Sequence, residues 1–285
     1  MSQIPQLPAV LIRPQVAAAL EEDLGRAGDV TSLATLGPDM EADAVMASRD
    51  AGVICGMGFA AEAFALMEAG ISFEPLVADG DAIAPGQEVA RVRGNARAVL
   101  SAERVALNYL MQLSGIATET RRYAEEIAGT GARITCTRKT TPGLRMAQKY
   151  AVRCGGGANH RFGLDDAIMI KDNHIAVAGG IRGALDAARA YAGHMLPIEI
   201  EVDRLDQYRE ALEAGAKIIL LDNMGPEGLR EAVALRPEGV VLEASGGVDI
   251  TTVRALAETG VDYISTSKIT MAAGTLDIGL DIHLS

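Results

Sequence analysis

The sequence predicts an α/β fold whose larger part is a β/α barrel, and three observations support this prediction. From residue 133 onward, short apolar segments alternate with helical segments, which is typical of parallel strands joined by helices. The last three apolar segments begin at residues 217, 239 and 261, a repeat of 22 residues. Charged or polar residues follow five of the six segments, where active sites of such barrels lie. A doubly wound open sheet is the alternative, but no Gly-x-Gly-x-x-Gly motif follows a strand candidate.

The first part of the chain predicts a mixture of helices and strands. Alternating polarity indicates a strand, and helical periodicity closed by glycine indicates a helix. On these criteria we expect helices at 14–25 and 58–70, a strand at 41–48, two strands within 71–94, and a long helix at 101–129 with Ser101 as its N-cap. The break between the two parts of the chain is expected in or near this long helix, around residue 113.

The second part predicts regular strand–helix units. The strand candidates lie at 133–137, 167–171, 198–202, 217–221, 239–243 and 261–265. Helix candidates between them lie at 204–215, 226–235 and 250–260. Six or more such units with short loops indicate a parallel β/α barrel.

The composition excludes several classes of protein. The chain has 285 residues, with 38 acidic and 26 basic ones, and a net charge of −12. A general nucleic-acid or anionic-membrane binder needs a basic surface, and no apolar run approaches the roughly 18 residues of a membrane-spanning helix. The start shows no basic segment followed by an apolar one, as a secretory signal would. Three cysteines without a Cys-x-x-Cys pair fit a reducing cytosol, so we expect a cytoplasmic location.

One region reverses the acidic balance. Residues 133–171 hold eight basic side chains against two acidic ones, and a local basic cluster in an acidic protein is a candidate anion site. Arg138 and Lys139 follow a strand candidate, and an arginine beside a lysine suits carboxylate or phosphate recognition. Lys171 ends the next strand candidate and is open to two interpretations, a Schiff-base lysine or a simple anion ligand.

Carboxylates accompany two later strand candidates. Glu199, Glu201 and Asp203 alternate along one of them, so they are expected to share one face. Asp222 follows the next candidate. Glu201 and Asp222 are candidates for pairing with the basic side chains, for binding sugar hydroxyls, or for binding a divalent cation such as Mg²⁺.

Two glycine-rich segments lie beside these charges. Residues 155–161 (GGGANHR) form either a flexible loop or a turn whose N–H groups close on an anion together with His160 and Arg161. Residues 245–247 (SGG) precede a helix expected from residue 249 or 250, and a glycine turn at a helix N-terminus can bind phosphate. These residues indicate a substrate with several negative charges, but they do not name the reaction.

Six segments in order closely resemble the signature segments of the quinolinate phosphoribosyltransferase family. They are residues 137–145 (TRKTTPGLR), 155–161 (GGGANHR), 170–175 (IKDNHI), 199–203 (EIEVD), 220–224 (LLDNM) and 243–247 (EASGG). Residues 22–25 (EDLG), 28–31 (GDVT) and 103–108 (ERVALN) also fit, so the resemblance spans nearly the whole chain. The family transfers phosphoribosyl from phosphoribosyl pyrophosphate (PRPP) to quinolinate with decarboxylation. The products are nicotinate mononucleotide, pyrophosphate and CO₂, in de novo NAD biosynthesis.

The resemblance implies a fold, an assembly and a cofactor. An N-terminal α/β sandwich would comprise residues 1–113, a partly open β/α barrel of about six to seven strands would comprise 114–272, and 273–285 would return to the sandwich. The family forms homodimers in which one subunit's sandwich covers the other's barrel, so Arg104 would act across the interface. Mg²⁺ would be the cofactor, bound largely through PRPP.

The resemblance also implies roles for individual residues. The quinolinate carboxylates would be held by Arg104, Arg138, His160, Arg161 and Lys171. The pyrophosphate would lie near Lys139, and the ribose hydroxyls or their Mg²⁺ would be held by Glu201 and Asp222. The 5′-phosphate would be bound by Ser245, Gly246, Gly247, Ser265 and Ser267. The residues expected to act in catalysis are Lys139, Lys171, Glu201 and Asp222.

One place departs from the family pattern. Ser267 and Met271 stand where the family usually has a glycine and a histidine, close to the expected 5′-phosphate site. Three alternatives stay open: a related barrel protein of molybdenum uptake, a Schiff-base lyase using Lys171 or Lys139, and a phosphate-sugar binding protein without catalysis. Residues 171–174 (KDNH) favour the quinolinate family over the molybdenum-uptake relative.

Overall fold

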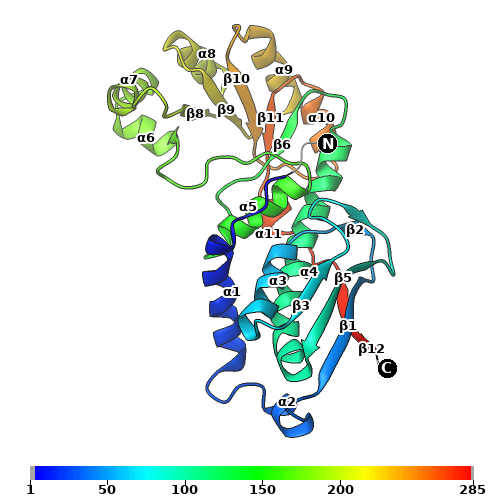
Figure 1. The fold of residues 1–285 in the computed structure, drawn as a ribbon. Coiled ribbons are helices and arrows are strands. Elements are labelled where there is room, and N and C mark those ends of the chain that lie inside the picture. The colour runs from blue at the N-terminus through cyan, green and yellow to red at the C-terminus, as the bar shows by residue number, and fades with distance from the viewer. Residues whose placement is uncertain (1–3, 284–285) are drawn as a thin grey trace. The chain divides into compact units, whose positions relative to one another are not determined.

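The computed structural model describes residues 4–283 and divides the chain into two compact units (Figure 1). The first unit comprises Met1–Glu119, Met146–Gly156 and Ala273–Ser285, and the second comprises Thr120–Arg145 and Gly157–Ala272. The passage from the first unit to the second lies within helix α4 (Ala96–Glu126).

An antiparallel sheet is the centre of the first unit. Its strands lie in the order β12-β1-β5-β3, with bounds Ile278–His283, Glu41–Ser48, Glu88–Asn95 and Ser72–Pro75. In β1 the side chains of Ala42, Ala44 and Met46 are buried at every second position, as the alternating sequence predicts. The short strands β2 (Gly52–Val53) and β4 (Ala82–Ile83) pair separately. Because β12 pairs with β1, the end of the chain completes the sheet of the first unit.

The helices of the first unit are α1 (Ala9–Leu24), α2 (Val30–Thr35), α3 (Met57–Met67), most of α5 (Arg145–Cys154) and the first part of α4. Helix α1 ends before Gly25 as predicted but starts five residues before the predicted Pro14. The predicted N-cap Ser101 is wrong. Helix α4 begins at Ala96, because the side chain of Asn95 accepts the N–H groups of Arg97 and Ala98 at 3.0 and 3.3 Å. Among residues 4–283, no helix is long and apolar enough to cross a membrane.

The second unit is built on a parallel sheet in the order β6-β11-β10-β9-β8-β7. The bounds of these strands are Arg133–Thr135, Tyr263–Ser265, Val241–Ser245, Ile218–Asp222, Ile198–Val202 and Ile168–Ile170. From β7 to β11 each strand lies next to the following strand in the chain, and β6 pairs with β11. This is the strand order of a barrel, because a doubly wound sheet would reverse its order partway. Within the described chain β6 and β7 are not paired, so the barrel is open there, and the predicted fold class is confirmed.

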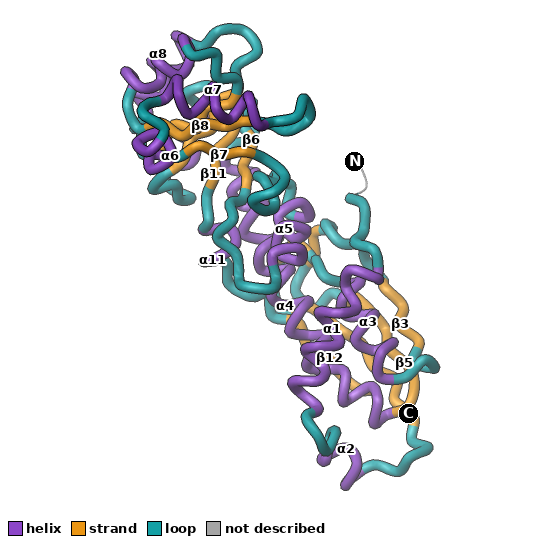
Figure 2. The backbone as a smooth tube through the Cα atoms, turned by 90° about the vertical axis from the view of Figure 1, so that its left-hand side faces the viewer, coloured by secondary structure: helices purple, strands orange, loops and turns teal. Residues whose placement is uncertain are grey.

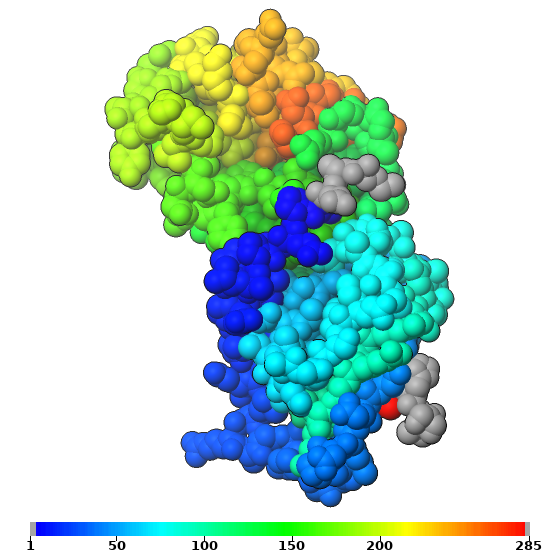
Figure 3. All heavy atoms as spheres, in the orientation of Figure 1, coloured from blue at the N-terminus to red at the C-terminus, as the bar shows by residue number. Residues whose placement is uncertain are grey.

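Alternation along the strands separates an apolar outer face from a polar inner one. Ile200, Ile219, Leu242 and Ile264 are fully buried, and the helices α7 (Ile181–Tyr191), α8 (Leu205–Glu213) and α9 (Pro226–Leu235) follow β7, β8 and β9. Figure 2 shows α7 and α8 beside β7 and β8, and in Figure 3 the same yellow-green to gold segments lie at the surface of the second unit in this view. The intervening residues of each strand therefore face the inside of the barrel.

Two local predictions about glycine turns need correction. The N–H groups of Gly155 and Gly156 donate to Ala151 O and Arg153 O at the end of α5, so they end this helix and are not available to an anion. After Gly247 the next helix, α10, spans Val253–Ala257, and does not start at 249 or 250. Asp249 forms a turn there, because its carboxylate accepts the N–H groups of Thr251 and Thr252.

Candidate active site

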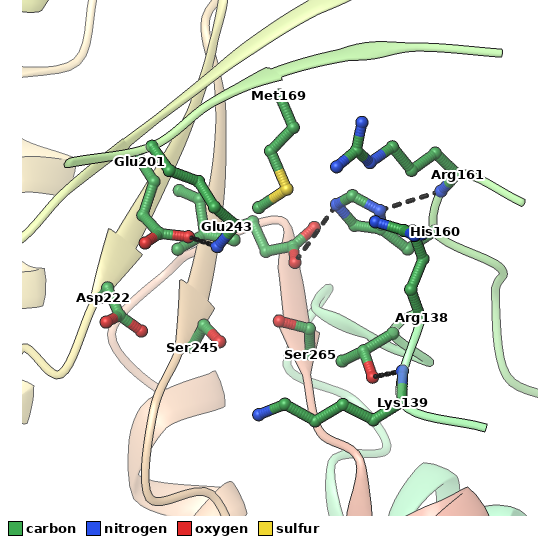
Figure 4. Close-up of a pocket in the computed structure, with 13 residues that line it drawn as sticks. Arg138, Lys139, His160, Arg161, Met169, Glu201, Asp222, Glu243, Ser245 and Ser265 are labelled. Carbon is green, nitrogen blue, oxygen red and sulfur yellow. Dashed lines mark hydrogen bonds and ion pairs between the residues drawn. The ribbon is translucent and has the colours of Figure 1, made fainter. Parts of the chain in front are cut away.

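A cavity of about 400 Å³ opens at the carboxyl ends of the parallel strands of the second unit (Figure 4). This is where barrels of this kind bind their ligands. It is lined by Thr137, Arg138, Lys139, His160, Arg161, Met169, Lys171, Glu201, Leu220, Asp222, Glu243, Ser245 and Ser265. On β9 and β10, residues at alternate positions line the cavity, as Glu243 and Ser245 do. Alternate side chains of a strand point to the same face of the sheet.

Arg138 and Arg161 form the cationic part of the cavity. Arg138 follows β6, and Arg161 follows Ala158, which pairs with the free edge of β6. The Nε atoms of both arginines are buried and have no hydrogen-bond partner among residues 4–283. Burial, together with the nearby Arg138 charge, lowers the pKa of the Arg161 guanidinium. An anion placed between the two side chains would relieve this repulsion and satisfy the donors.

His160 holds a defined tautomer beside these arginines. The backbone N–H of Arg161 donates to Nδ1 of His160 at 2.8 Å, so Nδ1 carries no hydrogen. Nε2 therefore carries it and donates to Glu199 at 2.8 Å. The second carboxyl near Nε2 belongs to Glu243, at 3.8 Å.

Glu199 and Glu243 form a buried carboxyl pair at the inner face of β8 and β10. Each is only 6% exposed. Desolvation, and after it the charge of Glu199, raises the pKa of Glu243 to about 7, against the smaller opposing effects of His160 and the Ser265 hydroxyl. Glu243 therefore keeps its proton at pH values below about 7.

Glu201 and Asp222 lie on the opposite side of Glu243 from the arginines in Figure 4. The Lys171 ammonium forms an ion pair with Oε2 of Glu201. Asp222 ends β9 and accepts a hydrogen bond from the Asn223 amide at 2.6 Å. Lys139 is exposed, and its side chain extends along the edge of the cavity toward Ser245.

The turn after β10 requires glycine. Gly246 has φ +89°, and a Cβ there would lie 2.1 Å from Oδ1 of Asn223. The N–H of Asn223 donates to Ser245 O at 2.9 Å, so the ends of β9 and β10 are held close together. Gly247 also has a positive φ, +63°.

The structure brings nine of the residues predicted for the site around this one cavity: Arg138, Lys139, His160, Arg161, Lys171, Glu201, Asp222, Ser245 and Ser265. Gly246 and Gly247 continue the adjoining turn, and Ser267 precedes α11 (Lys268–Met271) without lining the cavity. Arg104 is exposed on α4 in the first unit. Asp203 lies beyond the end of β8 and pairs with Arg204. It therefore does not line the cavity as Glu201 does.

Sequence reasoning assigned no role to Glu199 or Glu243. The signal was present, since Glu199 alternates with Glu201 and Glu243 alternates with Ser245. Only the folded chain shows that both carboxyls face His160.

An open parallel barrel with a cationic cavity at the carboxyl ends of its strands defines the class of β/α-barrel proteins that bind an anionic ligand at that edge. Two family models match the chain: the C-terminal domain of quinolinate phosphoribosyl transferase at residues 116–281 and its N-terminal domain at residues 29–114. The chain belongs to the quinolinate phosphoribosyltransferase family.

Similar proteins agree with this assignment over the full length. A probable nicotinate-nucleotide pyrophosphorylase [carboxylating] of Bacillus subtilis is 44% identical, covering 93% of this chain and 91% of the relative. The corresponding Mycobacterium leprae protein is 42% identical over 95% of this chain and 96% of its own. The solved nicotinate-nucleotide pyrophosphorylase of Francisella tularensis superposes with a TM-score of 0.94 at 37% identity, covering 99% of this chain and all of that one.

Proposed function

We propose that this protein transfers phosphoribosyl from PRPP to quinolinate and removes one carboxylate, giving nicotinate mononucleotide, pyrophosphate and CO₂ in de novo NAD biosynthesis. The observation that carries the proposal is one cavity that holds two arginines with unpartnered buried Nε atoms, Arg138 and Arg161, and also the carboxylates of Glu201 and Asp222. The two arginines suit a dicarboxylate, and the two carboxylates suit a ribose. The cytoplasm stays the expected compartment, on the sequence argument from cysteine usage.

Arg138 and Arg161 bind the two carboxylates of quinolinate. The guanidinium fork matches a carboxylate in two parallel hydrogen bonds, and the free buried Nε atoms supply donors that the protein itself does not use. Lys171 adds a point charge, held in place by Glu201. His160 orients the loop, since its ring receives the Arg161 N–H. The dianion also offsets the mutual repulsion of the two arginines.

Glu201 and Asp222 bind the ribose and stabilise the charge that develops on it. Breaking the bond between ribose C1 and pyrophosphate builds oxocarbenium character, as in glycoside hydrolysis. Two carboxylates at neighbouring strand ends are placed to interact with that positive charge.

Magnesium fits these residues as an ion shared with the substrate. Mg²⁺ prefers oxygen ligands and usually binds through one or two carboxylates plus substrate phosphates. Glu201 and Asp222 offer such oxygens, and Glu201 also pairs with Lys171. When bound, Mg²⁺ would stabilise the negative charge of the leaving pyrophosphate.

The phosphates lie along the exposed edge of the cavity. Lys139 lines the cavity and would bind the pyrophosphate. The 5′-phosphate would contact the turn and the hydroxyls at the ends of β10 and β11: Ser245, Gly246, Gly247, Ser265 and Ser267. Because Ser267 replaces the usual glycine, the phosphate contact at that position would come from a hydroxyl or from the adjoining backbone.

A homodimer would complete the site with Arg104 from the second subunit. Arg104 is an exposed side chain outside the set that lines the cavity. Mixing an Arg104→Ala chain with a Lys171→Ala chain tests this arrangement, because a heterodimer has one site free of both changes. Recovered activity supports the proposal, and its absence in mixed dimers shown to form contradicts it.

The reaction is tested by incubating the protein with Mg²⁺ and PRPP, and with quinolinate or nicotinate in parallel. We expect CO₂ and nicotinate mononucleotide in equal amounts from quinolinate. Turnover of nicotinate without turnover of quinolinate would refute the proposal. Borohydride should trap no substrate on Lys171 or Lys139, whereas a trapped adduct would support the lyase alternative.

A further inference from the structure

The proposed reaction requires a proton at a particular carbon atom. Loss of CO₂ leaves the electron pair of the broken C–C bond on ring carbon C2, next to the ring nitrogen that has just bonded to ribose. A proton must then form the new C2–H bond. The source of that proton is a question that rests on the proposed function.

We propose that Glu243 donates the proton that replaces the departing CO₂. Arg138 and Arg161 lie on one side of the cavity, and Glu201 and Asp222 on the other (Figure 4). If the first pair holds the carboxylates and the second the ribose, the ring nitrogen and C2 lie between them. The side chain of Glu243 lies in that middle position, and it lines the cavity.

The surroundings of Glu243 explain why it holds a proton. Two buried carboxyls, Glu199 and Glu243, face a single N–H, and Glu199 takes it at 2.8 Å. Oε1 of Glu243 is buried and has no hydrogen-bond partner within residues 4–283. Two ionised carboxylates this close repel each other, so one of them binds a proton.

Three strands and one loop contribute the neighbours of Glu243. From β8 the titratable neighbour is Glu199, and from the loop after α5 it is His160. Ser265 of β11 contributes a hydroxyl, and on β9 the residue in register is the apolar Leu220. The remaining charged groups of the cavity are Arg138, Lys139, Arg161, Lys171, Glu201 and Asp222.

A metal ion is the main competing interpretation of this cluster. The ligand atoms of His160, Glu199 and Glu243 lie within 4.8 Å of one another. A histidine binds a metal through a nitrogen without hydrogen, but here Nδ1 accepts the Arg161 N–H and Nε2 keeps its hydrogen. The cluster therefore fits a shared proton better than a metal.

The other carboxyls of the cavity are less suited to give a proton. Glu201 is held in an ion pair with the Lys171 ammonium. Asp222 accepts a hydrogen bond from the Asn223 amide at 2.6 Å, so both carboxyls already have a partner that Oε1 of Glu243 lacks.

The step balances without a cofactor. The C2–carboxylate bond breaks, CO₂ leaves, and its bonding electrons stay on C2, stabilised by the positive ring nitrogen. The O–H bond of Glu243 then breaks, its proton forms the C2–H bond, and the Glu243 carboxylate regains a proton from solvent.

The test is Glu243→Gln, which keeps the shape of a neutral carboxyl and its hydrogen-bonding but has no acidic proton to give. We expect kcat with quinolinate and PRPP to fall about 100-fold, the effect typical of losing a general acid. The dissociation constant for quinolinate, measured by calorimetry, should stay close to that of the unchanged protein. Asp203→Asn is the matched control, because Asp203 is exposed, pairs with Arg204 and lies outside the cavity. The control should keep kcat.

A kcat of Glu243→Gln close to that of the unchanged protein would overturn the inference, because an amide would then suffice. Loss of quinolinate binding in parallel with kcat would also overturn it, since it indicates a structural role. If the variant does not fold, the pH profile of the unchanged protein decides. kcat should decline as pH rises past neutrality, and a flat alkaline profile refutes proton donation. Absence of quinolinate turnover by the unchanged protein would instead refute the proposed function.

Discussion

Burial of Glu243 predicts a pH-dependent effect on stability, independent of catalysis. The folded protein raises the pKa of this carboxyl from its ordinary 4.5 to about 7. The unfolded chain therefore releases the proton at lower pH than the folded protein, and the unchanged protein loses stability as pH rises from 4.5 through 7. Each pKa unit corresponds to about 1.4 kcal/mol, so the full loss is about 3 kcal/mol. Glutamine does not ionise and escapes this loss.

Urea unfolding of the unchanged protein and of Glu243→Gln at about pH 4.5 and about pH 8.5 measures the effect. The free energy of unfolding of the variant, relative to the unchanged protein, should rise by about 3 kcal/mol between the two pH values. Comparing the two proteins at each pH cancels the titration of groups common to both. A difference that stays constant with pH would show that Glu243 is ionised in the folded protein and would refute the reasoning about the carboxyl pair.

Three further predictions follow from side-chain donors and close backbone contacts. Arg138→Ala should weaken quinolinate binding in calorimetry by about 2–5 kcal/mol, because it removes one partner of a buried charge pair; unchanged affinity contradicts the assignment. Gly246→Ala should raise the KM for PRPP severalfold, because the new Cβ would lie 2.1 Å from a side-chain oxygen at φ +89° and shift the turn; an unchanged KM would exclude the turn from phosphate binding. Gly115→Ala should lower the unfolding free energy by about 1–3 kcal/mol in urea, because its Cβ would lie 1.9 Å from Gly274 O. Gly193→Ala, with open space around the new Cβ, is the control and should show no comparable loss.

The barrel could be predicted because its signal is local. Each strand candidate of the second part became a strand, with β8 matching at 198–202 and α9 at 226–235. Apolar side chains at alternate positions must be buried whichever strands lie beside them. The alternation can therefore be recognised in the sequence of a single strand. Helix starts were less predictable. Ser101 and Asn95 are both favourable N-cap residues, and the choice depends on how β5 runs into α4.

The basic cluster at 133–171 shows the same division between local and tertiary information. The sequence places eight basic residues there, but it does not show which of them line a binding site and which hold loops together. In the structure Arg138, Arg161 and Lys171 line the cavity, whereas Arg145 donates to Thr140 and to Phe162 O and so ties two loops together. Charge count alone cannot distinguish a binding arginine from a structural one, because the folded chain decides which donors find partners. Arg145 donates to two neighbouring loops, whereas the buried Nε atoms of Arg138 and Arg161 have no partner among residues 4–283.

The sequence by itself determined the fold class, the family and the polar residues at the strand ends, because period-two alternation and ordered motifs are properties of consecutive residues. Only the tertiary structure decided that Glu199 and Glu243 both face the His160 N–H, which Glu199 accepts. The two carboxyls come from different strands, and His160 lies 39 residues before Glu199. The energy of a buried charge depends on its distance from other charges and from water, and both are set only when the strands lie side by side.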